Sequence, residues 1–328
     1  MKTQIQILHF RDVHDTLECL EALFAISGDI HRILVIDNTG DAMPGEPALE
    51  ALASAGRISL IKTRENMGFA GGHNLGFEMA FEQGAEYVWI LNNDTTVRAD
   101  TLEKLTQALA DDTSLAAVSP VILEHATGKP QHLGSVIDLQ TLRVTQVSSF
   151  EQLAAWQQAG QTFTLWGTAL LLRVSALKQI GGFDPALFAY FEDADLSCRL
   201  LNRGYRTAVV SDAVITHKEV HDPASGLRLP HYYFYMVRNK TLFMRKQACQ
   251  QSRLWIAREN LAYTLDFLLT CLTHRDEACV NAVLDGYYCG ITGQGGVWNP
   301  ALHMPRGAAV LLRRFAWPLS RVVRPRVS

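Results

Sequence analysis

Apolar and polar positions in residues 1–110 follow two alternating periods. Short segments that alternate or run apolar, as strands do, occur at residues 4–10, 32–36, 57–61 and 87–91. Segments with apolar side chains at helical spacing lie between and after them, at residues 15–26, 48–55, 69–83 and 100–110. Asp100 is the expected N-cap of the last helix. This β-α-β-α order predicts a mainly parallel α/β sheet with helices on both faces.

The pattern is less regular after residue 115. It predicts a strand at 118–123, a loop and hairpin that could form a flap over 124–165, and a small, apolar segment at 164–174. A helix at 195–203 and a strand at 206–210 follow. Long helices rich in aromatic residues and arginine are expected at 231–249 and 254–272. We therefore expect an α/β domain over residues 1–225 and a helical region over 226–328.

Charge is divided unevenly between these two regions. Residues 1–225 hold 16 Lys and Arg against 28 Asp and Glu, whereas residues 226–328 hold 14 against 5. A basic region on an acidic body indicates an anionic surface as partner. The tail at 306–328 holds six arginines among apolar residues, and Pro318 predicts that a helix at 308–316 ends in a bent tail. Such a tail suits an anionic membrane; packing of Leu311, Leu312, Phe315 and Trp317 on the α/β domain is the alternative.

Composition excludes several classes of protein. Hydrophobic residues make up 48% of the 328 residues and charged residues 19%, which excludes a disordered chain. Six cysteines without a CxxC pair argue against a disulfide scaffold and a structural zinc site. There is no signal-peptide pattern and no apolar run of about 18 residues. We expect a cytoplasmic protein, peripheral at the inner face of the membrane if the tail binds lipid, with no nucleic acid partner.

Polar side chains follow three of the predicted strands. His9, Phe10 and Arg11 end the first, Asp37 and Asn38 end the second, and Asn92, Asn93 and Asp94 end the strand at 87–91. Ligands of such sheets bind beyond the carboxyl ends of the strands. These side chains are therefore expected on one edge of the sheet.

A glycine-rich block occupies residues 66–76, after a strand and at the start of a helix. Glycines there let backbone N–H groups approach a phosphate at a helix N-terminus. A tight turn with close helix–sheet packing explains them equally well. The spacing matches neither GxGxxG nor a Walker A loop, which excludes those two readings.

Three further positions carry candidate chemistry. Asn92-Asn93-Asp94 could hold a hard divalent cation against a phosphate, or form a solvated turn. Glu192, Asp193 and Asp195 open a helix, where a carboxylate could act as general base or simply favour the helix dipole. His217 could be a metal ligand, although a lone histidine is more often a surface or core residue.

Together these motifs resemble the family 2 inverting glycosyltransferases of the GT-A fold, in the rhamnosyltransferase-like branch. The matching blocks, in order, are VIDN at 35–38, NMGFAGGHNLG at 66–76, ILNND at 90–94, GGFD at 181–184 and YFEDADLSCR at 190–199. The resemblance covers about residues 3–220. It implies that residues 1–225 form the GT-A catalytic domain, with nucleotide-sugar binding in the first half and the acceptor and base in the second.

The resemblance also implies roles for individual residues. Asp193 would be the catalytic base, and Asp94 with His217 would bind Mn²⁺ or Mg²⁺. Donor contacts would come from Phe10, Arg11, Asp37, Asn66, Gly68, Phe69, Gly72, Asn74, Asn92 and Asn93. Acceptor contacts would come from Trp166, Tyr190, Glu192 and Asp195. For the two aromatic residues, packing in the core is the alternative. Two positions depart from the family: Arg11 stands where Asn is usual, and amides occupy the first two positions of the DXD motif.

The implied reaction is metal-assisted transfer of a sugar, such as rhamnose or another hexose, from a dTDP- or UDP-linked donor to a hydroxyl of a glycan. The acceptor would be a growing surface polysaccharide on a lipid. Sugar-nucleotide pyrophosphorylases share the architecture but have a glycine-rich loop after the first strand, where this chain has His9-Phe10-Arg11-Asp12. An inactive glycan- or nucleotide-sugar-binding scaffold protein remains a second hypothesis.

Overall fold

The computed structural model describes residues 2–28, 30–218, 227–248 and 250–323. Its contacts divide the chain into two compact units. The first comprises residues 1–137, 143–184 and 192–219, and the second comprises residues 138–142, 185–191 and 220–328. The boundary expected after residue 225 falls outside the described residues. Two short segments inside the α/β region, 138–142 and 185–191, are counted with the helical unit.

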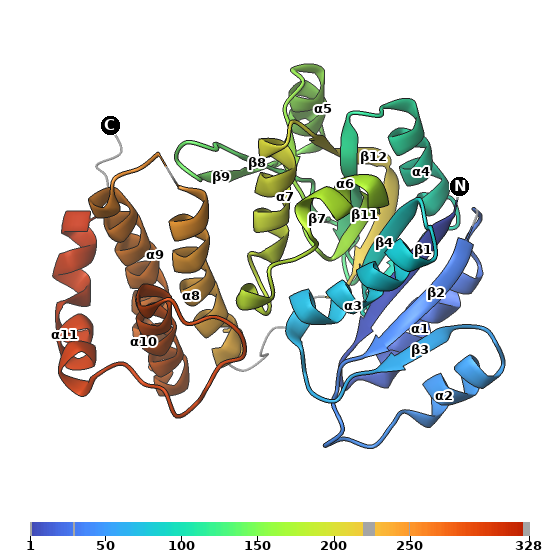
Figure 1. The fold of residues 1–328 in the computed structure, drawn as a ribbon. Coiled ribbons are helices and arrows are strands. Elements are labelled where there is room, and N and C mark those ends of the chain that lie inside the picture. The colour runs from blue at the N-terminus through green and yellow to red at the C-terminus, as the bar shows by residue number, and fades with distance from the viewer. Residues whose placement is uncertain (1, 29, 219–226, 249, 324–328) are drawn as a thin grey trace. The chain divides into compact units, whose positions relative to one another are not determined.

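A nine-stranded sheet forms the centre of the first unit (Figure 1). Its main path runs in the order β3 (Ser59–Lys62), β2 (Ile30–Asp37), β1 (Thr3–His9), β4 (Tyr87–Asn92), β11 (Ala169–Arg173), β6 (Leu115–Glu124), β12 (Arg206–His217) and β5 (Thr95–Val97). The ninth strand, β7 (Pro130–His132), pairs with β6. Strands β1 to β4 pair in parallel, whereas β11 runs antiparallel to both its neighbours. The sheet is therefore mixed and mostly parallel, as predicted.

Both faces of this sheet are buried, which explains the apolar runs. On β4, Trp89 and Leu91 pack in one core with residues of α1 (Val13–Phe24), α2 (Pro47–Ser54) and α4 (Thr101–Asp111). Val88 and Ile90 belong to a second core with α3 (Gly68–Glu82), α6 (Val174–Ile180) and α7 (Glu192–Asn202). Successive side chains of a strand point to opposite faces. The prediction of helices on both faces is confirmed.

Residues 124–165 are more structured than the loop and hairpin that we expected. Three short strands, β8 (Ser135–Ile137), β9 (Val144–Gln146) and β10 (Phe163–Thr164), form a second sheet. Helix α5 (Phe150–Gln158) begins after Ser149, whose hydroxyl accepts a hydrogen bond from the Gln152 N–H at 3.2 Å. Asp100 precedes α4 as predicted, but its side chain makes no cap hydrogen bond, because it pairs with Lys104 at 2.8 Å.

The glycines of α3 are explained largely by helix–sheet packing. A Cβ atom added to Gly72 would stand 2.4 Å from Leu8 Cδ1, and one added to Gly76 would stand 2.3–2.5 Å from three atoms of the Gln6 amide. Gln6 is fully buried, and its Nε2 donates to the His73 carbonyl at 2.7 Å. Of the two interpretations of the block, close packing therefore accounts for Gly72 and Gly76.

Replacing Gly76 by Ala is expected to lower the free energy of unfolding by about 1–3 kcal/mol, because the buried Gln6 amide has no room to move. Gly307→Ala is the matched control, since an added Cβ there meets nothing within 4 Å and alanine favours helix. Urea unfolding of both variants measures the difference. Equal stability of Gly76→Ala and the wild type would contradict this account.

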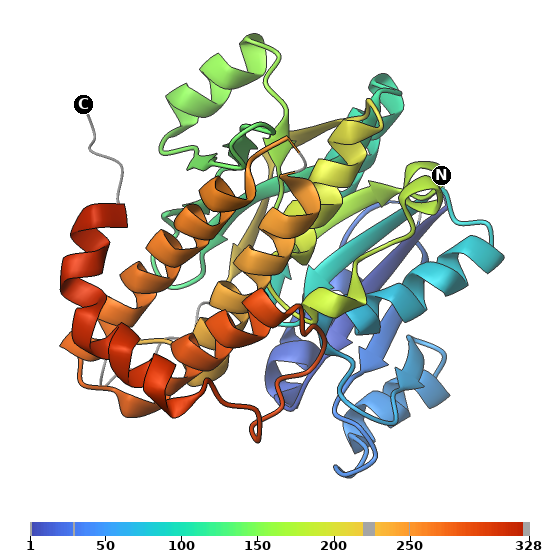
Figure 2. The same ribbon diagram turned by 60° about the vertical axis from the view of Figure 1, so that its left-hand side comes forward.

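The second unit contains α8 (Pro230–Gln247), α9 (Arg253–Thr273), α10 (Glu277–Thr292) and α11 (Arg306–Val323) among its described residues; they are orange to red in Figure 2. Helices α8 and α9 match the predicted ones closely, although residue 249, the predicted end of the first, lies outside the described residues. Their apolar faces share a core with α10 that includes Phe234, Leu265 and Val283. No helix among the described residues is long and apolar enough to span a membrane.

The prediction for the C-terminal tail is wrong in one respect. Helix α11 continues through Pro318 to Val323 instead of ending near residue 316. Proline removes one N–H donor, but packing supports both sides of it, because Ala316 and Ser320 are buried and Arg258 Nε donates to the Val323 carbonyl at 2.9 Å. Two of the six tail arginines, at 324 and 326, lie outside the described residues.

Candidate active site

The ends of three strands meet at one edge of the sheet, as the topology predicts. His9 pairs with Asp37 between β1 and β2, and Leu8 pairs with Asn92 between β1 and β4. Phe10, Asn38 and Asn93, which were predicted at these strand ends, follow directly. This edge therefore gathers residues that are far apart in the sequence.

At the end of β2, Asp37 and Asn38 organise the loop before α3. Asp37 is buried, and its Oδ1 accepts hydrogen bonds from the N–H and hydroxyl of Thr39 at 3.1 and 2.6 Å. Asn38 Nδ2 donates to Asn66 Oδ1 at 3.0 Å and to the Gly68 carbonyl at 3.1 Å. Sequence reasoning missed the clamping role of Asn38, although it lies in the quoted VIDN block.

The end of β1 presents an exposed ring and an exposed cation. The Arg11 guanidinium lies 4.9 Å from the centre of the Phe10 ring. Arg11 has a φ of 69°, in the left-handed region, where Asn is more easily accommodated than Arg. Contact of Phe10 and Arg11 with a nucleobase stays a prediction.

The residues of α3 for which we expected donor contacts have structural partners. Phe69 packs on His73, with ring centres 4.4 Å apart, and on Phe183 at 5.7 Å. Asn74 accepts from the Phe183 N–H and donates to the Phe183 carbonyl, both at 2.9 Å. These contacts join α3 to the GGFD turn; donor binding by Gly68, Phe69, Gly72 and Asn74 stays a prediction.

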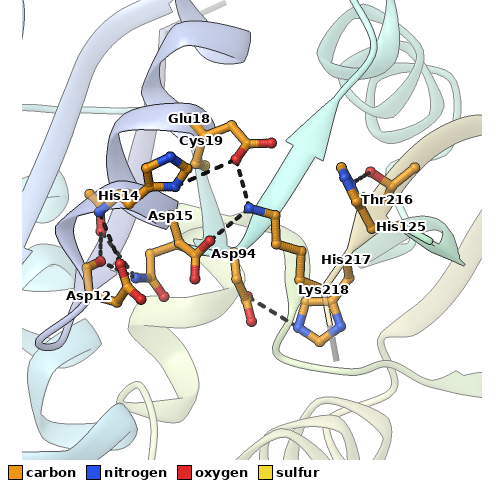
Figure 3. Close-up of polar contacts among 12 residues, drawn as sticks. Asp12, His14, Asp15, Glu18, Cys19, Asp94, His125, Thr216, His217 and Lys218 are labelled. Atoms are coloured by element: carbon orange, nitrogen blue, oxygen red, sulfur yellow. Dashed lines mark hydrogen bonds and ion pairs between the residues drawn. The ribbon is translucent and has the colours of Figure 1, made fainter. Parts of the chain in front are cut away.

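Asp94 and His217 lie close together although they are 123 positions apart in the chain. His217 Nε2 lies 3.2 Å from Asp94 Oδ1 (Figure 3). It also lies 3.4 Å from Asn92 Nδ2. On the other side of the ring, Nδ1 lies 2.8 Å from Gln131 Oε1. An amide oxygen only accepts hydrogen bonds, so Nδ1 carries the proton and Nε2 presents a lone pair in the neutral ring.

This arrangement fits a divalent cation. Asp94 Oδ1 is buried and receives no hydrogen bond from any described residue. Neighbouring ligands of an octahedral ion at about 2.1 Å stand about 3 Å apart, which matches the spacing of Asp94 Oδ1 and His217 Nε2. Orientation of a ligating histidine through its second nitrogen is also usual. Gln131 is a residue that sequence reasoning missed.

Neighbouring contacts hold this pair of candidate ligands to α1. Lys218 Nζ lies 2.7 Å from Asp15 Oδ1 and 2.6 Å from Glu18 Oε2 (Figure 3). The Lys218 backbone N–H donates to the Asp94 carbonyl at 3.0 Å.

Asp15 and Glu18 with His14 could geometrically hold an ion of their own, but the Lys218 ammonium already pairs with both carboxylates. Asn93 Nδ2 donates to Thr16 Oγ1 at 3.0 Å, which also ties this turn to α1.

The first turn of α7 carries the candidate base. Asp193 Oδ2 accepts from the Gly167 N–H at 3.0 Å, and Oδ1 accepts from the Ala194 N–H at 2.7 Å. Burial raises the pKa of Asp193, and these donors oppose the rise. Burial raises the pKa of Glu192 well above its usual value, and the charge of Asp193 adds to the effect. Burial therefore raises the pKa of both neighbouring carboxyl groups.

The other residues proposed for the acceptor have different surroundings. Trp166 is half-buried and stacks on His132 with ring centres 4.0 Å apart; burial lowers the pKa of His132 to about 3. Asp195 is fully buried and forms an ion pair with Arg199 at 2.7 Å, so its observed role is structural.

Tyr190 belongs to the second unit, where its ring meets Tyr232 edge-on at 5.3 Å. Acceptor binding by these residues stays a prediction.

One short segment links the two halves of the candidate site. The Thr168 carbonyl accepts a hydrogen bond from the Asn92 N–H at 2.9 Å. Asn92 lies two residues before Asp94 in the chain. Gly167, next to Thr168, donates to Asp193. A Cβ at Gly167 would stand 3.0 Å from the Phe69 ring, which explains the glycine. The segment 166–168 therefore connects the end of β4, at Asn92, with the first turn of α7, which carries Asp193.

Known proteins resemble this chain in sequence and in fold. The family model described as glycosyl transferase family group 2 matches residues 87–280. A dTDP-rhamnosyl transferase, RfbF, from Shigella flexneri is 22% identical over 76% of this chain and 84% of its own length. Galactofuranosyltransferase GlfT1 from Mycobacterium tuberculosis is 26% identical over 64% of this chain and 68% of its own.

A shorter match has higher identity. An N-acetylglucosaminyl-diphospho-decaprenol L-rhamnosyltransferase from M. tuberculosis is 42% identical over 76 residues, which are 22% of this chain and only 25% of that protein.

Two solved structures share the fold. The mannosyltransferase PcManGT from Pyrobaculum calidifontis, in complex with GDP-Man and Mn²⁺, has a TM-score of 0.55 and 16% identity, over 98% of this chain and 83% of its own. GalNAc-T7 with UDP, GalNAc and Mn²⁺ has a TM-score of 0.56 and 14% identity, over 81% of this chain and 57% of its own. Since the family model matches more than half of the chain, this protein belongs to glycosyl transferase family group 2 and is a rhamnosyltransferase-like glycosyltransferase of the GT-A fold.

Proposed function

We propose that this glycosyltransferase moves a sugar from a nucleotide-diphosphate donor to a glycan hydroxyl in one inverting displacement, with Asp193 as base. The proposal rests chiefly on the segment 166–168, which is hydrogen-bonded to Asn92 on one side and to Asp193 on the other. This segment thereby ties the candidate base, Asp193, to the strand whose end leads to the candidate cation-binding pair. A direct displacement needs both, because the leaving diphosphate gains charge while the acceptor hydroxyl loses its proton.

Asp94 and His217 would hold a divalent cation, Mn²⁺ or Mg²⁺, which as a Lewis acid stabilises the charge on the departing diphosphate. Gln131 keeps the Nε2 lone pair of His217 turned toward Asp94. Asp193 takes the proton of the acceptor hydroxyl on its carboxylate while the Gly167 N–H fixes the orientation of that group. The raised pKa of Asp193 improves it as a base, since a base is most effective when its pKa is near the working pH.

For the donor, we propose a dTDP- or UDP-linked sugar, with rhamnose as first candidate. The named relatives include a dTDP-rhamnosyl transferase and an L-rhamnosyltransferase. Phe10 and Arg11 would flank the nucleobase at the edge of the sheet, and Asp37 would accept a hydrogen bond from it. Asn66, Asn92 and Asn93 would line the rest of the donor site.

Thermal shift with Mn²⁺ and a panel of nucleotide diphosphates and sugar nucleotides tests the donor. A ligand present at about 100 times its Kd stabilises the folded protein by about 2.7 kcal/mol. We expect the largest rise in Tm with dTDP-rhamnose, together with its slow hydrolysis. If no sugar nucleotide raises the Tm or is hydrolysed, the transferase proposal is wrong.

For the acceptor, we propose a lipid-linked glycan reached through α11. The side chains of Leu311, Phe315 and Val322 follow each other at helical spacing on one face, and Leu311 is 58% and Val322 76% exposed. Arg314 and Arg321 border this stripe, and Trp317 is exposed as well. Exposed apolar and cationic residues along one helix suit the interface of an anionic membrane.

Replacing Arg314 and Arg321 together by Gln is expected to weaken binding to anionic vesicles about 30-fold, because each basic residue near the surface contributes about 1 kcal/mol. Arg98→Gln with Arg203→Gln removes the same charge from exposed positions of the first unit and is the control. Sedimentation with phosphatidylserine vesicles at low and high salt measures both pairs. Equal binding of the two double variants would contradict an anchor at α11.

A further inference from the structure

A buried pair of polar side chains on α8 is not used by the proposed mechanism. Arg238 and Asn239 are 1% and 0% exposed. Arg238 Nε donates to Asn239 Oδ1 at 2.8 Å, which turns the Nδ2 group of Asn239 away from the guanidinium. Burying polar groups of this kind costs free energy unless they are fully hydrogen-bonded. Their hydrogen-bond partners therefore indicate the role of the pair.

Most of their partners are backbone carbonyls of one segment, although Arg238 Nη1 also donates to the Gly296 carbonyl. Asn239 Nδ2 lies 2.7 Å from the carbonyls of Leu187 and Ala189 and 2.8 Å from that of Tyr190. Arg238 Nη2 donates to the carbonyls of Ala186 and Leu187, at 3.3 and 3.1 Å. The pair therefore gathers four carbonyls from residues 186–190, all within the second unit.

This segment is strained and needs such support. Phe188, Tyr190 and Phe191 have φ values of 60°, 68° and 70°, in the left-handed region that side chains other than glycine seldom adopt. Two of their rings pack on α8: Phe188 stacks on Tyr235 at 5.2 Å, and Phe191 meets Phe243 at 5.6 Å. Phe191 also meets Tyr263 of α9 at 6.4 Å. Hydrogen bonds and ring contacts from α8 thus support the conformation of residues 186–191.

Phe191 is followed directly by Glu192 and Asp193. We propose that Arg238 and Asn239 are positioning residues of the transferase, which hold residues 186–191 in the strained conformation from which Asp193 enters α7 in its reactive orientation. The inference rests on the proposed role of Asp193 as base. It gives the helical C-terminal region a part in the reaction besides binding a membrane.

The test compares Asn239→Ala with Asn260→Ala, which removes a buried asparagine of α9 from the same unit. Hydrogen–deuterium exchange of residues 186–194 is expected to rise at least tenfold in Asn239→Ala and to stay unchanged in Asn260→Ala. Unchanged exchange in Asn239→Ala would overturn the proposal whatever the substrate is. Arg238→Lys keeps the charge but loses the Nε donor, and it should raise the exchange in the same segment if Asn239→Ala does not fold.

Kinetics of dTDP-rhamnose hydrolysis separate this inference from the role of Asp193. Asn239→Ala should lower kcat at least 30-fold with the donor KM within twofold of wild type, and Asn260→Ala should keep kcat. In the Asp193→Asn background, Asn239→Ala should cause little further loss, because residues that act through one group are not additive. Full additivity would overturn positioning through Asp193, whereas a fully active Asp193→Asn would instead refute the base.

Discussion

Replacing Asp193 by Asn is expected to lower kcat by about 10²- to 10⁴-fold, the usual contribution of general-base catalysis. Asparagine keeps the size of the side chain and can still accept the hydrogen bond from Gly167, but it cannot take a proton. Donor binding should stay within about twofold of wild type, because Asp193 meets the acceptor and not the nucleotide in the proposed mechanism. The measurement is steady-state turnover alongside a separate titration with dTDP.

Asp212→Asn is the control for this experiment, because Asp212 lies on β12 with its side chain 68% exposed. It should keep full turnover. If Asp193→Asn retains more than about a tenth of the wild-type kcat, the base lies elsewhere. The pH profile provides a second check: kcat requires ionised Asp193, and burial raises the pKa of this group. Turnover should therefore fall with decreasing pH at values above the ordinary aspartate pKa of about 3.9.

The sequence predicted the parallel half of the sheet well, because strands buried on both faces and helices with one apolar face have distinct periods. It predicted a hairpin within residues 124–165, which β8 and β9 form, but it revealed neither α5 nor β10 and gave no bounds for these strands. Two- and three-residue strands are too short to show a period, and their pairing depends on distant residues such as Phe163 and Val136. Ser149 before α5 was a cap signal that could have been used.

At Pro318 the sequence predicted the end of a helix that the structure does not show. A local rule predicted that the helix ends, but contacts of α11 with α9, such as the hydrogen bond from Arg258 to Val323, stabilise the helix beyond the proline. Tertiary packing therefore outweighed a local preference. Such contacts between distant segments are not visible in a single sequence.

For the site, position along the strands was informative and side-chain partners were not. The strand ends at Asp37 and Asn92 were expected on one edge, since parallel strands share their direction, and the register confirms this. Gln131 could not have been found, because it lies on a three-residue strand whose relation to His217 arises only in the fold. Likewise, Asp195 has the same sequence signal as Asp193, yet it faces Arg199.

The fit of the Asp94–His217 pair to a divalent cation leads to the second large effect. Excess EDTA is expected to abolish transfer, and Mn²⁺ should restore it. Asp94→Asn and His217→Ala should each weaken Mn²⁺ binding in the presence of dTDP, measured by calorimetry, and lower kcat in parallel. A site with one imidazole and one carboxylate favours Mn²⁺ over Mg²⁺, because imidazole suits transition metals better.

Gln131→Leu separates a metal site from a simple ion pair between Asp94 and His217. Without the acceptor at Nδ1, His217 is free to rotate and to change tautomer, so we expect a 10- to 100-fold loss of Mn²⁺ affinity, as is usual when such supporting partners are removed. Asp212→Asn is again the control, because its side chain is 68% exposed on β12. Full activity in excess EDTA, or equal Mn²⁺ affinity of Asp94→Asn and the wild type, would show that these residues hold no catalytic cation.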